Sequence, residues 1–127
     1  MNTPIRAVIL TVSDRCSRGE TVDSSGPALA KLAVERLHST IVHSGCLPDE
    51  PGQLAAFFAD WSEPSRGVDL ILSTGGTGLA PRDNTPEALR RVMRREHAGL
   101  MELARLRCFQ KTPRAYLSRG IAGTIHR

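Results

Sequence analysis

The sequence predicts an α/β protein with three layers, in which a mainly parallel β-sheet has helices on both faces. Three apolar runs rich in β-branched residues, at 5–12, 40–47 and 68–74, are typical of buried strands. Apolar residues at helical spacing lie between them, in a helix capped by Ser25 that runs to about residue 38 and in another at 53–61. This alternation needs crossover connections and therefore indicates a parallel sheet. No linker or repeat divides the 127 residues, so we expect one domain.

The last third of the chain predicts a helix over 85–108 with a break near Gly99. After it, the Gly-Thr-Ile step at 123–125 is typical of the approach to another strand. Residues 90–127 hold ten Lys/Arg and two Asp/Glu, and four of the arginines recur at helical spacing opposite apolar residues: Arg90, Arg91, Arg94 and Arg95. We interpret them as a solvated helix face. Nucleic-acid binding is the alternative, but an aromatic content of 4% leaves few base-stacking platforms.

The composition, 40% apolar and 24% charged, is that of a globular protein. No apolar run approaches the ~20 residues that span a bilayer, and the apolar start lacks the features of a signal peptide. Cys16, Cys46 and Cys108 are odd in number and far apart, which argues against a disulfide framework and a structural zinc site. We therefore expect a reducing, cytoplasmic location.

The stretch "LSTGGTGLAPRDNTPEAL" carries the most chemistry, because it leaves the carboxyl end of the third predicted strand. Gly75, Gly76 and Gly78 lack a Cβ, so they can adopt positive φ and direct amide groups at an anion. Thr77 adds a hydroxyl, and Thr85 is expected to cap a helix whose N-terminus also favours an anion. The pattern predicts a phosphate cradle. A tight turn that needs glycine only for its geometry is the alternative, since neither the P-loop pattern nor the dinucleotide fingerprint is present.

A carboxylate beside a phosphate cradle would be repelled unless a divalent cation lies between them. Asp83 follows the glycines, and Asp49 follows the second strand in "LPDE", at the same edge of the sheet. Mg²⁺ prefers one or two carboxylates together with phosphate oxygens. The two aspartates therefore predict a Mg-nucleotide site suited to phosphoryl-type transfer. The alternative for each aspartate is a helix N-cap or a turn residue.

The sequence resembles the MogA/MoaB family of molybdenum-cofactor biosynthesis proteins, which includes the G domains of gephyrin and the plant Cnx proteins. The resemblance covers most of the chain, in the family's order, through these segments: "TVSDRCSRGETVDSSGPAL", "LPDE", "LILSTGGTGLAPRDNTPEAL", "GLMELARLRC" and "TPRAYLSRGIAG". It implies the molybdopterin-binding α/β fold, usually as a homotrimer. It also implies molybdopterin adenylylation, in which the terminal phosphate of molybdopterin attacks the α-phosphate of Mg-ATP and pyrophosphate leaves.

The resemblance implies that Asp49 and Asp83 are the catalytic, Mg²⁺-binding pair. The binding residues that it implies come from three segments, namely Ser13, Asp14 and Arg15 after the first strand, Gly75, Gly76, Thr77 and Gly78 in the glycine loop, and Ser118 and Arg119 on the pterin side. A molybdenum-insertion enzyme is an expected partner.

Family members continue past "SRxxAG" into another strand and an "NLPG"-type loop, whereas this sequence ends in "GTIHR". We therefore expect a single domain over 1–127 that lacks those two features. This difference leaves open a second function, a molybdopterin-binding carrier or scaffold without turnover. A domain of the molybdate-inserting enzymes is a third possibility, against which the "SDR" loop and the single-domain length both count.

Overall fold

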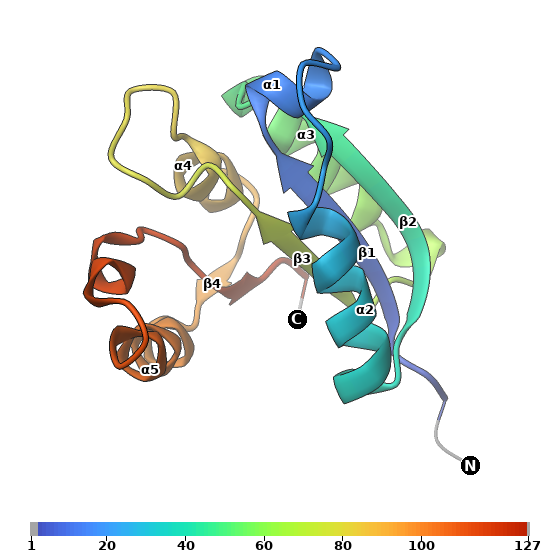
Figure 1. Ribbon diagram of the computed structural model, residues 1–127. Coiled ribbons are helices and arrows are strands. Elements are labelled where there is room, and N and C mark those ends of the chain that lie inside the picture. The colour runs from blue at the N-terminus through green and yellow to red at the C-terminus, as the bar shows by residue number, and fades with distance from the viewer. Residues whose placement is uncertain (1–2, 127) are drawn as a thin grey trace.

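The centre of the protein is a parallel sheet of three strands (Figure 1), seen in a computed structural model that describes residues 3–126. The strands are β1 (Arg6–Val12), β2 (Thr40–Leu47) and β3 (Leu70–Thr74), and their order in the sheet is β2-β1-β3. Both pairings are parallel. The three predicted strands are thus confirmed, with β1 and β3 beginning one and two residues later than expected.

β1 is apolar from Ala7 to Leu10 because it lies at the middle of the sheet and is covered on both faces. From Ala7 to Leu10 its residues are at most 1% exposed. Its Leu10 lies opposite Gly45 of β2 and Ser73 of β3. A strand that neighbours enclose on all sides needs no polar alternation, which is why it appears in the sequence as a continuous hydrophobic run.

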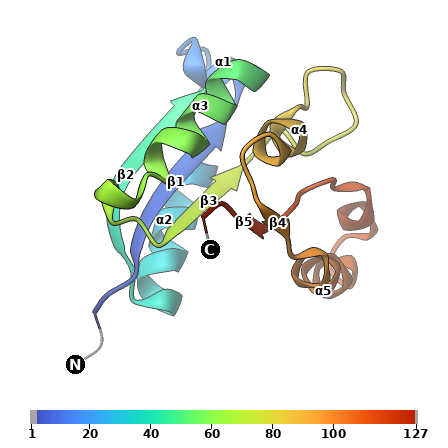
Figure 2. The same cartoon turned by 180° about the vertical axis from the view of Figure 1, so that it is seen from behind.

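Helices cover the two faces of the sheet and make the predicted three layers. α2 (Ser25–Leu37) crosses one face, in front in Figure 1, and α3 (Pro51–Trp61) crosses the other, in front in Figure 2. α4 (Thr85–Arg90) packs beside α3. The buried core on this second face consists of Leu10, Val12, Leu54, Phe58 and Ala88. The short 3₁₀ helix η1 (Pro64–Arg66) then leads from α3 to β3.

The segment after β1 is more ordered than the predicted loop. It contains a single helical turn, α1 (Asp14–Ser17), whose N-cap Ser13 accepts a hydrogen bond from the Cys16 amide at 3.2 Å. The prediction that Ser25 caps α2 is wrong, because Ser25 is the first residue inside the helix. Asp23 supplies the capping bond instead, since its carboxylate accepts from the Gly26 amide at 3.0 Å.

The segment predicted as a helix over 85–108 is helical at both ends and broken between them, but the break spans 91–97 and not Gly99. α4 ends at Arg90, a short strand β4 (Arg95–Glu96) follows, and α5 (Ala98–Phe109) begins before Gly99. β4 pairs antiparallel with β5 (Gly123–Thr124), so the break comes from hydrogen bonds to a distant segment that local periodicity cannot reveal. The Gly-Thr-Ile step is predicted to approach another strand, but its first two residues themselves form β5, which joins β4 rather than the central sheet. The four arginines at 90–95 consequently do not share one helix face.

β4, α5, the 3₁₀ helix η2 (Pro113–Leu117) and β5 form a lobe beside β3, which we call the C-terminal lobe (Figure 1). α5 packs mainly against η2 and has no buried residue. Within residues 3–126, no helix combines the length and the hydrophobicity that crossing a bilayer requires.

Candidate functional site

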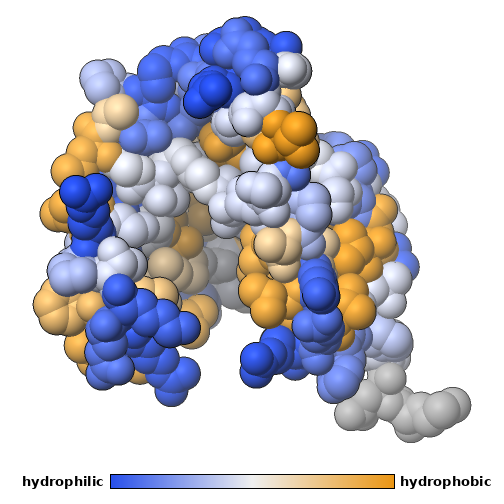
Figure 3. Space-filling model, in the orientation of Figure 1, coloured by the Kyte–Doolittle hydropathy of each residue, from blue (hydrophilic) through white to orange (hydrophobic). Residues whose placement is uncertain are grey.

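The loops that leave the carboxyl ends of the three strands are tied together by hydrogen bonds and ion pairs. Asp14, after β1, accepts a hydrogen bond from the Asp49 amide, after β2, at 2.9 Å. Arg82, after β3, donates two bonds to Asp14, at 2.8 and 3.1 Å, and one to Glu50 at 2.6 Å. Hydrophilic residues gather over this end of the molecule, at the top of Figure 3. The structure therefore brings the three predicted loops to one place.

The glycine turn that follows β3 has the positive φ angles that only glycine adopts readily. Gly75 and Gly76 have φ values of +97° and +71°. A Cβ on Gly75 would overlap the carbonyl oxygen of Val12, so the turn presses against the end of β1. Gly75 is exposed and Gly76 half-buried, which leaves the turn open to solvent. The tight-turn interpretation is thus correct for the geometry, and it leaves the anion-binding interpretation open.

Both predicted aspartates lie directly against this glycine turn. A Cβ on Gly76 would lie 2.6 Å from Oδ2 of Asp49, and a Cβ on Gly78 would lie 2.7 Å from Oδ2 of Asp83. The missing side chains therefore make room for two carboxylates. The turn and the two acids form one cluster, as the Mg-phosphate hypothesis requires.

Asp49 is a buried carboxylate in an acidic environment. It is 4% exposed, and its two oxygens accept from the Asn84 amide at 3.1 and 3.2 Å. Burial raises the pKa of Asp49, and the nearby charges of Asp83 and Asp14 raise it further, whereas the Asn84 amide and Arg82 act in the opposite direction. The residue at the N-cap of α3 is Glu50, so Asp49 does not cap its own helix. A bound cation would relieve its unfavourable burial.

Asp83 combines a local structural bond with its position beside the glycines. Its Oδ2 accepts from the Ala80 amide at 2.9 Å, which closes the turn at 80–83. The turn-residue interpretation therefore holds for this oxygen. Because a carboxylate has about four lone-pair directions, this bond does not prevent Asp83 from binding a cation as well.

Thr85 is a feature that the sequence did not single out as a ligand. It was expected to cap the helix, but α4 begins at Thr85 itself and Asn84 is the N-cap. Its hydroxyl oxygen is buried and has no hydrogen-bond partner among residues 3–126, and a Cβ on Gly76 would overlap it. An unpaired buried hydroxyl costs free energy, so a ligand at this position would satisfy it. α4 has only six residues, and the expectation that its N-terminus favours an anion stays a prediction.

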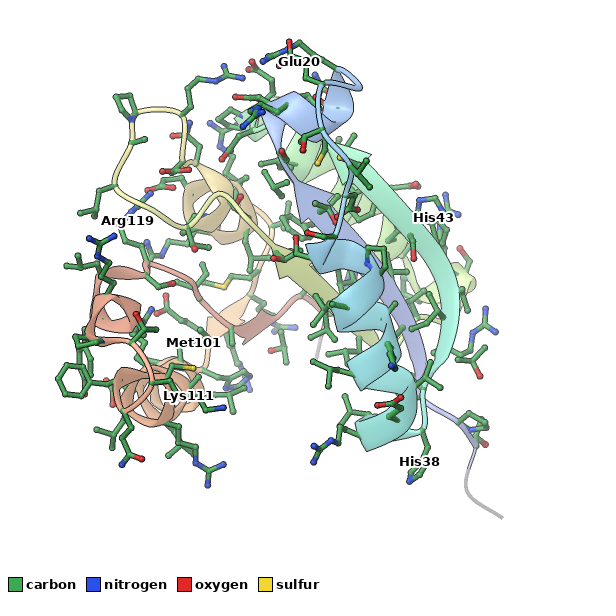
Figure 4. The ribbon with its side chains drawn as sticks, in the orientation of Figure 1. Glu20, His38, His43, Met101, Lys111 and Arg119 are labelled. Carbon is green, nitrogen blue, oxygen red and sulfur yellow. The ribbon has the colours of Figure 1, made fainter. Side chains whose placement is uncertain are left out.

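The C-terminal lobe reaches the glycine loop through Ser118 and Arg119, whose predicted role on the pterin side stays a prediction. The Arg119 amide donates to the Thr77 carbonyl at 2.8 Å, and its Nε donates to the Gly78 carbonyl at 2.8 Å. Its guanidinium also donates to the Asp83 carbonyl and pairs with Glu87, and Figure 4 shows Arg119 between the lobe and the loop.

These bonds turn the carbonyl groups of Thr77, Gly78 and Asp83 toward Arg119, which reduces the repulsion that a bound anion would meet. The Ser118 hydroxyl lies 3.4 Å from that of Thr77. Arg119 is therefore best described as the residue that holds the loop in shape, rather than as a free ligand-binding cation.

The three residues of the first predicted binding segment, Ser13 to Arg15, differ in their contacts with the site. Ser13 caps α1, and Asp14 links the loops through Arg82, which lowers the pKa of Asp14 by hydrogen bonding. Arg15 is exposed on α1, and within residues 3–126 no hydrogen bond or ion pair joins it to the glycine turn. Sequence reasoning also assigned no role to Arg82, although its place in "PRD" beside Asp83 offered a signal.

The donors at this cluster suit a hard cation. Asp49, Asp83 and Thr85 supply oxygen atoms only, and Mg²⁺ is normally held by one or two carboxylates with phosphate oxygens and water completing its shell. Among the described residues, no three His, Cys, Asp or Glu side chains form a complete metal site. The residues present therefore fit Mg²⁺ that arrives with a phosphate ligand.

Comparison with known proteins assigns the family. A family model described as "Probable molybdopterin binding domain" matches residues 8–126. The chain belongs to the molybdopterin-binding domain family. Its place there is in the MoaB/MogA group of molybdenum cofactor biosynthesis proteins, as the resemblance of the motifs predicted.

Several members of the molybdopterin-binding domain family show how far the likeness extends. "Molybdenum cofactor biosynthesis protein B" of Staphylococcus aureus strain MRSA252 is 34% identical over 129 residues, which are 99% of this chain and 74% of that protein. The crystal structure of MoaB from Thermus thermophilus superposes with a TM-score of 0.85 at 45% identity, over 94% of this chain and 74% of that one. The fly protein "Molybdenum cofactor synthesis protein cinnamon" is 38% identical over 91% of this chain, which spans 19% of the fly protein's length.

Proposed function

We propose that this protein is a molybdopterin adenylyltransferase, which transfers AMP from Mg-ATP to the terminal phosphate of molybdopterin. The observation that carries the proposal is the cluster at the end of β3, where an open glycine turn, two carboxylates and an unpaired hydroxyl lie together. The family supplies the pterin, since it is described as molybdopterin-binding. The oxygen donors of Asp49, Asp83 and Thr85 suit Mg²⁺ and are the reason to propose a metal-bound nucleotide.

In this proposal Asp49 and Asp83 would hold Mg²⁺, with the Thr85 hydroxyl beside them. The cation would neutralise charge on the phosphates of the nucleotide. The glycine turn binds a phosphate group through its amide groups, and Arg119 keeps that turn in place. A phosphate oxygen of molybdopterin attacks the α-phosphorus of ATP, the bond from that phosphorus to the β-phosphate oxygen breaks, and pyrophosphate leaves. Such a reaction depends mainly on positioning and charge neutralisation.

Further properties of the proposed enzyme follow from the resemblance of its motifs to the family. We propose that it acts in the cytoplasm as a homotrimer and delivers its product to a molybdenum-insertion enzyme. A carrier that binds molybdopterin without consuming ATP is the competing function. The experiment below separates the two.

The test is pyrophosphate release from Mg-ATP in the presence and absence of molybdopterin. We expect release that requires both molybdopterin and Mg²⁺. Asp49→Asn and Asp83→Asn should each lower the rate by at least ~100-fold, since each removes a charge at the reacting phosphates. Asp60→Asn is the matched control, because Asp60 lies at the far end of α3, where it pairs with Arg66 at 2.7 Å.

The outcomes divide the alternatives. Tight binding of molybdopterin with no release of pyrophosphate would support the carrier. Full turnover in both Asp49→Asn and Asp83→Asn would show that the cluster is not the reacting centre. A loss of activity in Asp60→Asn equal to that in the two site variants would point to a general loss of folding instead.

A further inference from the structure

Two half-buried cysteines lie beside the candidate site, one on α1 and one on β2. Cys46 lies opposite Thr11 of β1 in the parallel register, at the end of β2. Just beyond it, the Ser13 amide donates to the Leu47 carbonyl at 2.9 Å, so α1 begins against this end of β2. The Cys16 amide donates to the Ser13 side chain at 3.2 Å, which starts α1, and α1 contacts β2. Residues far apart in the sequence are thus brought together.

α1, which carries Cys16, packs against β2, which carries Cys46, so the two thiols belong to elements in contact. Burial raises the pKa of the Cys46 thiol, and the neighbouring Cys16 and Asp23 raise it further, with Cys16 acting both through its charge and as a hydrogen-bond partner. Both cysteines are free and neither is fully exposed. Because a thiolate is the reactive form, the raised pKa slows the reaction of Cys46 at neutral pH.

We propose that Cys16 and Cys46 form a reversible intramolecular disulfide in the presence of a peroxide, which makes the start of α1 an oxidation-sensitive element. This inference does not depend on the proposed enzymatic function. The Cys16 thiolate attacks one peroxide oxygen, the O–O bond breaks, and a sulfenic acid forms with loss of one water or alcohol. The Cys46 sulfur then attacks the sulfenic sulfur, and water leaves as the S–S bond forms. Two thiols are oxidised, and one peroxide is reduced.

The position of this bond gives it an effect on the site. A disulfide is ~2 Å long, much shorter than the contact between unbonded sulfur atoms, so closing it draws α1 toward β2. Asp14, the first residue of α1, accepts a hydrogen bond from the Asp49 amide and two from Arg82. The disulfide therefore acts on the residues that join the three loops. Cytoplasmic disulfides of this kind are usually transient and redox-sensing.

The test uses peptide mapping of the full chain, because trypsin places the three cysteines in separate peptides. These peptides are 16–18, 37–66 and 108–111. After treatment with one equivalent of hydrogen peroxide and blocking of the remaining thiols, we expect loss of two of the three thiols and a linked 16–18/37–66 pair. The pair should disappear after reduction with dithiothreitol.

Two variants and one condition make the result decisive. Cys108→Ser should keep the linked pair, since Cys108 is exposed on α5 in the other lobe, whereas Cys16→Ser should lose it. Linkage should form faster in the folded protein than in urea, because the fold holds the two thiols together. The proposal would be overturned if oxidised Cys108→Ser gave peptides 16–18 and 37–66 only as separate species. It would also be overturned if the linkage formed at the same rate with and without urea.

Discussion

Replacing Gly76 by alanine tests whether the glycine turn and the acidic cluster are as close as the structure indicates. The new Cβ would overlap the Thr85 hydroxyl and lie 2.6 Å from Oδ2 of Asp49, and Gly76 has a φ of +71°. An alanine in the left-handed region costs about 1–2 kcal/mol. Overpacking a buried site adds about 1–3 kcal/mol. We expect Gly76→Ala to lower the free energy of unfolding by about 2–5 kcal/mol, a large part of the stability of a small domain.

The assay is urea unfolding followed by circular dichroism, with Gly52→Ala as the control. A Cβ on Gly52 meets nothing within 4 Å, and the residue lies in the first turn of α3. That substitution should be neutral or stabilising by up to about 1 kcal/mol. The contrast between two Gly→Ala changes in one chain removes the general effect of adding a methyl group.

A double-mutant cycle separates the contact with Thr85 from the strain of the backbone. Thr85→Ala removes the hydroxyl that the new Cβ would overlap, so Gly76→Ala should cost less in that background by about 1–2 kcal/mol. The cost of the positive φ remains in both. If the free energy of unfolding of Gly76→Ala lies within about 0.5 kcal/mol of the wild-type value, the turn is not pressed against the cluster and the reasoning fails.

Substitutions at three other residues test the same site. Asp49→Asn should gain stability relative to the wild type as the pH rises from about 4 to 7, because the pKa of Asp49 is raised in the folded state and its ionisation therefore opposes folding. A difference in the free energy of urea unfolding that does not change with pH would contradict this. Thr85→Val should raise the free energy of unfolding by about 1 kcal/mol, since it replaces a buried hydroxyl that is unpaired within residues 3–126 with a methyl group. It should also weaken Mg-ATP binding measured by calorimetry. A lower free energy of unfolding than that of the wild type would show that the hydroxyl has a partner. Arg119→Ala should increase amide hydrogen exchange across the 77–83 loop. Arg119→Lys should restore the protection from exchange only in part, because a lysine cannot reproduce the planar set of hydrogen bonds. Unchanged exchange in Arg119→Ala would show that Arg119 does not hold the loop.

The sequence by itself determined the central sheet and the position of the site along the chain. Its three apolar runs are strands because a parallel sheet buried on both faces needs continuous hydrophobic residues, and this pattern is local. The glycine triplet and the "LPDE" segment follow strand ends, and in a parallel sheet those ends share one edge. The adjacency of Asp49, Asp83 and the glycines could therefore be predicted without coordinates.

The tertiary structure decided everything that depends on contacts between distant segments. The helix expected over 85–108 is interrupted because Arg94 and His97 donate backbone bonds to Thr124 and Ala122, which no local periodicity encodes. The role of Arg119 and the contact of α1, which carries Cys16, with β2, which carries Cys46, arise in the same way. So does the Thr85 hydroxyl, which is unpaired within residues 3–126. A hydrogen bond or a buried polar group depends on which chains meet in space, whereas periodicity along the sequence records only which face of each element is apolar.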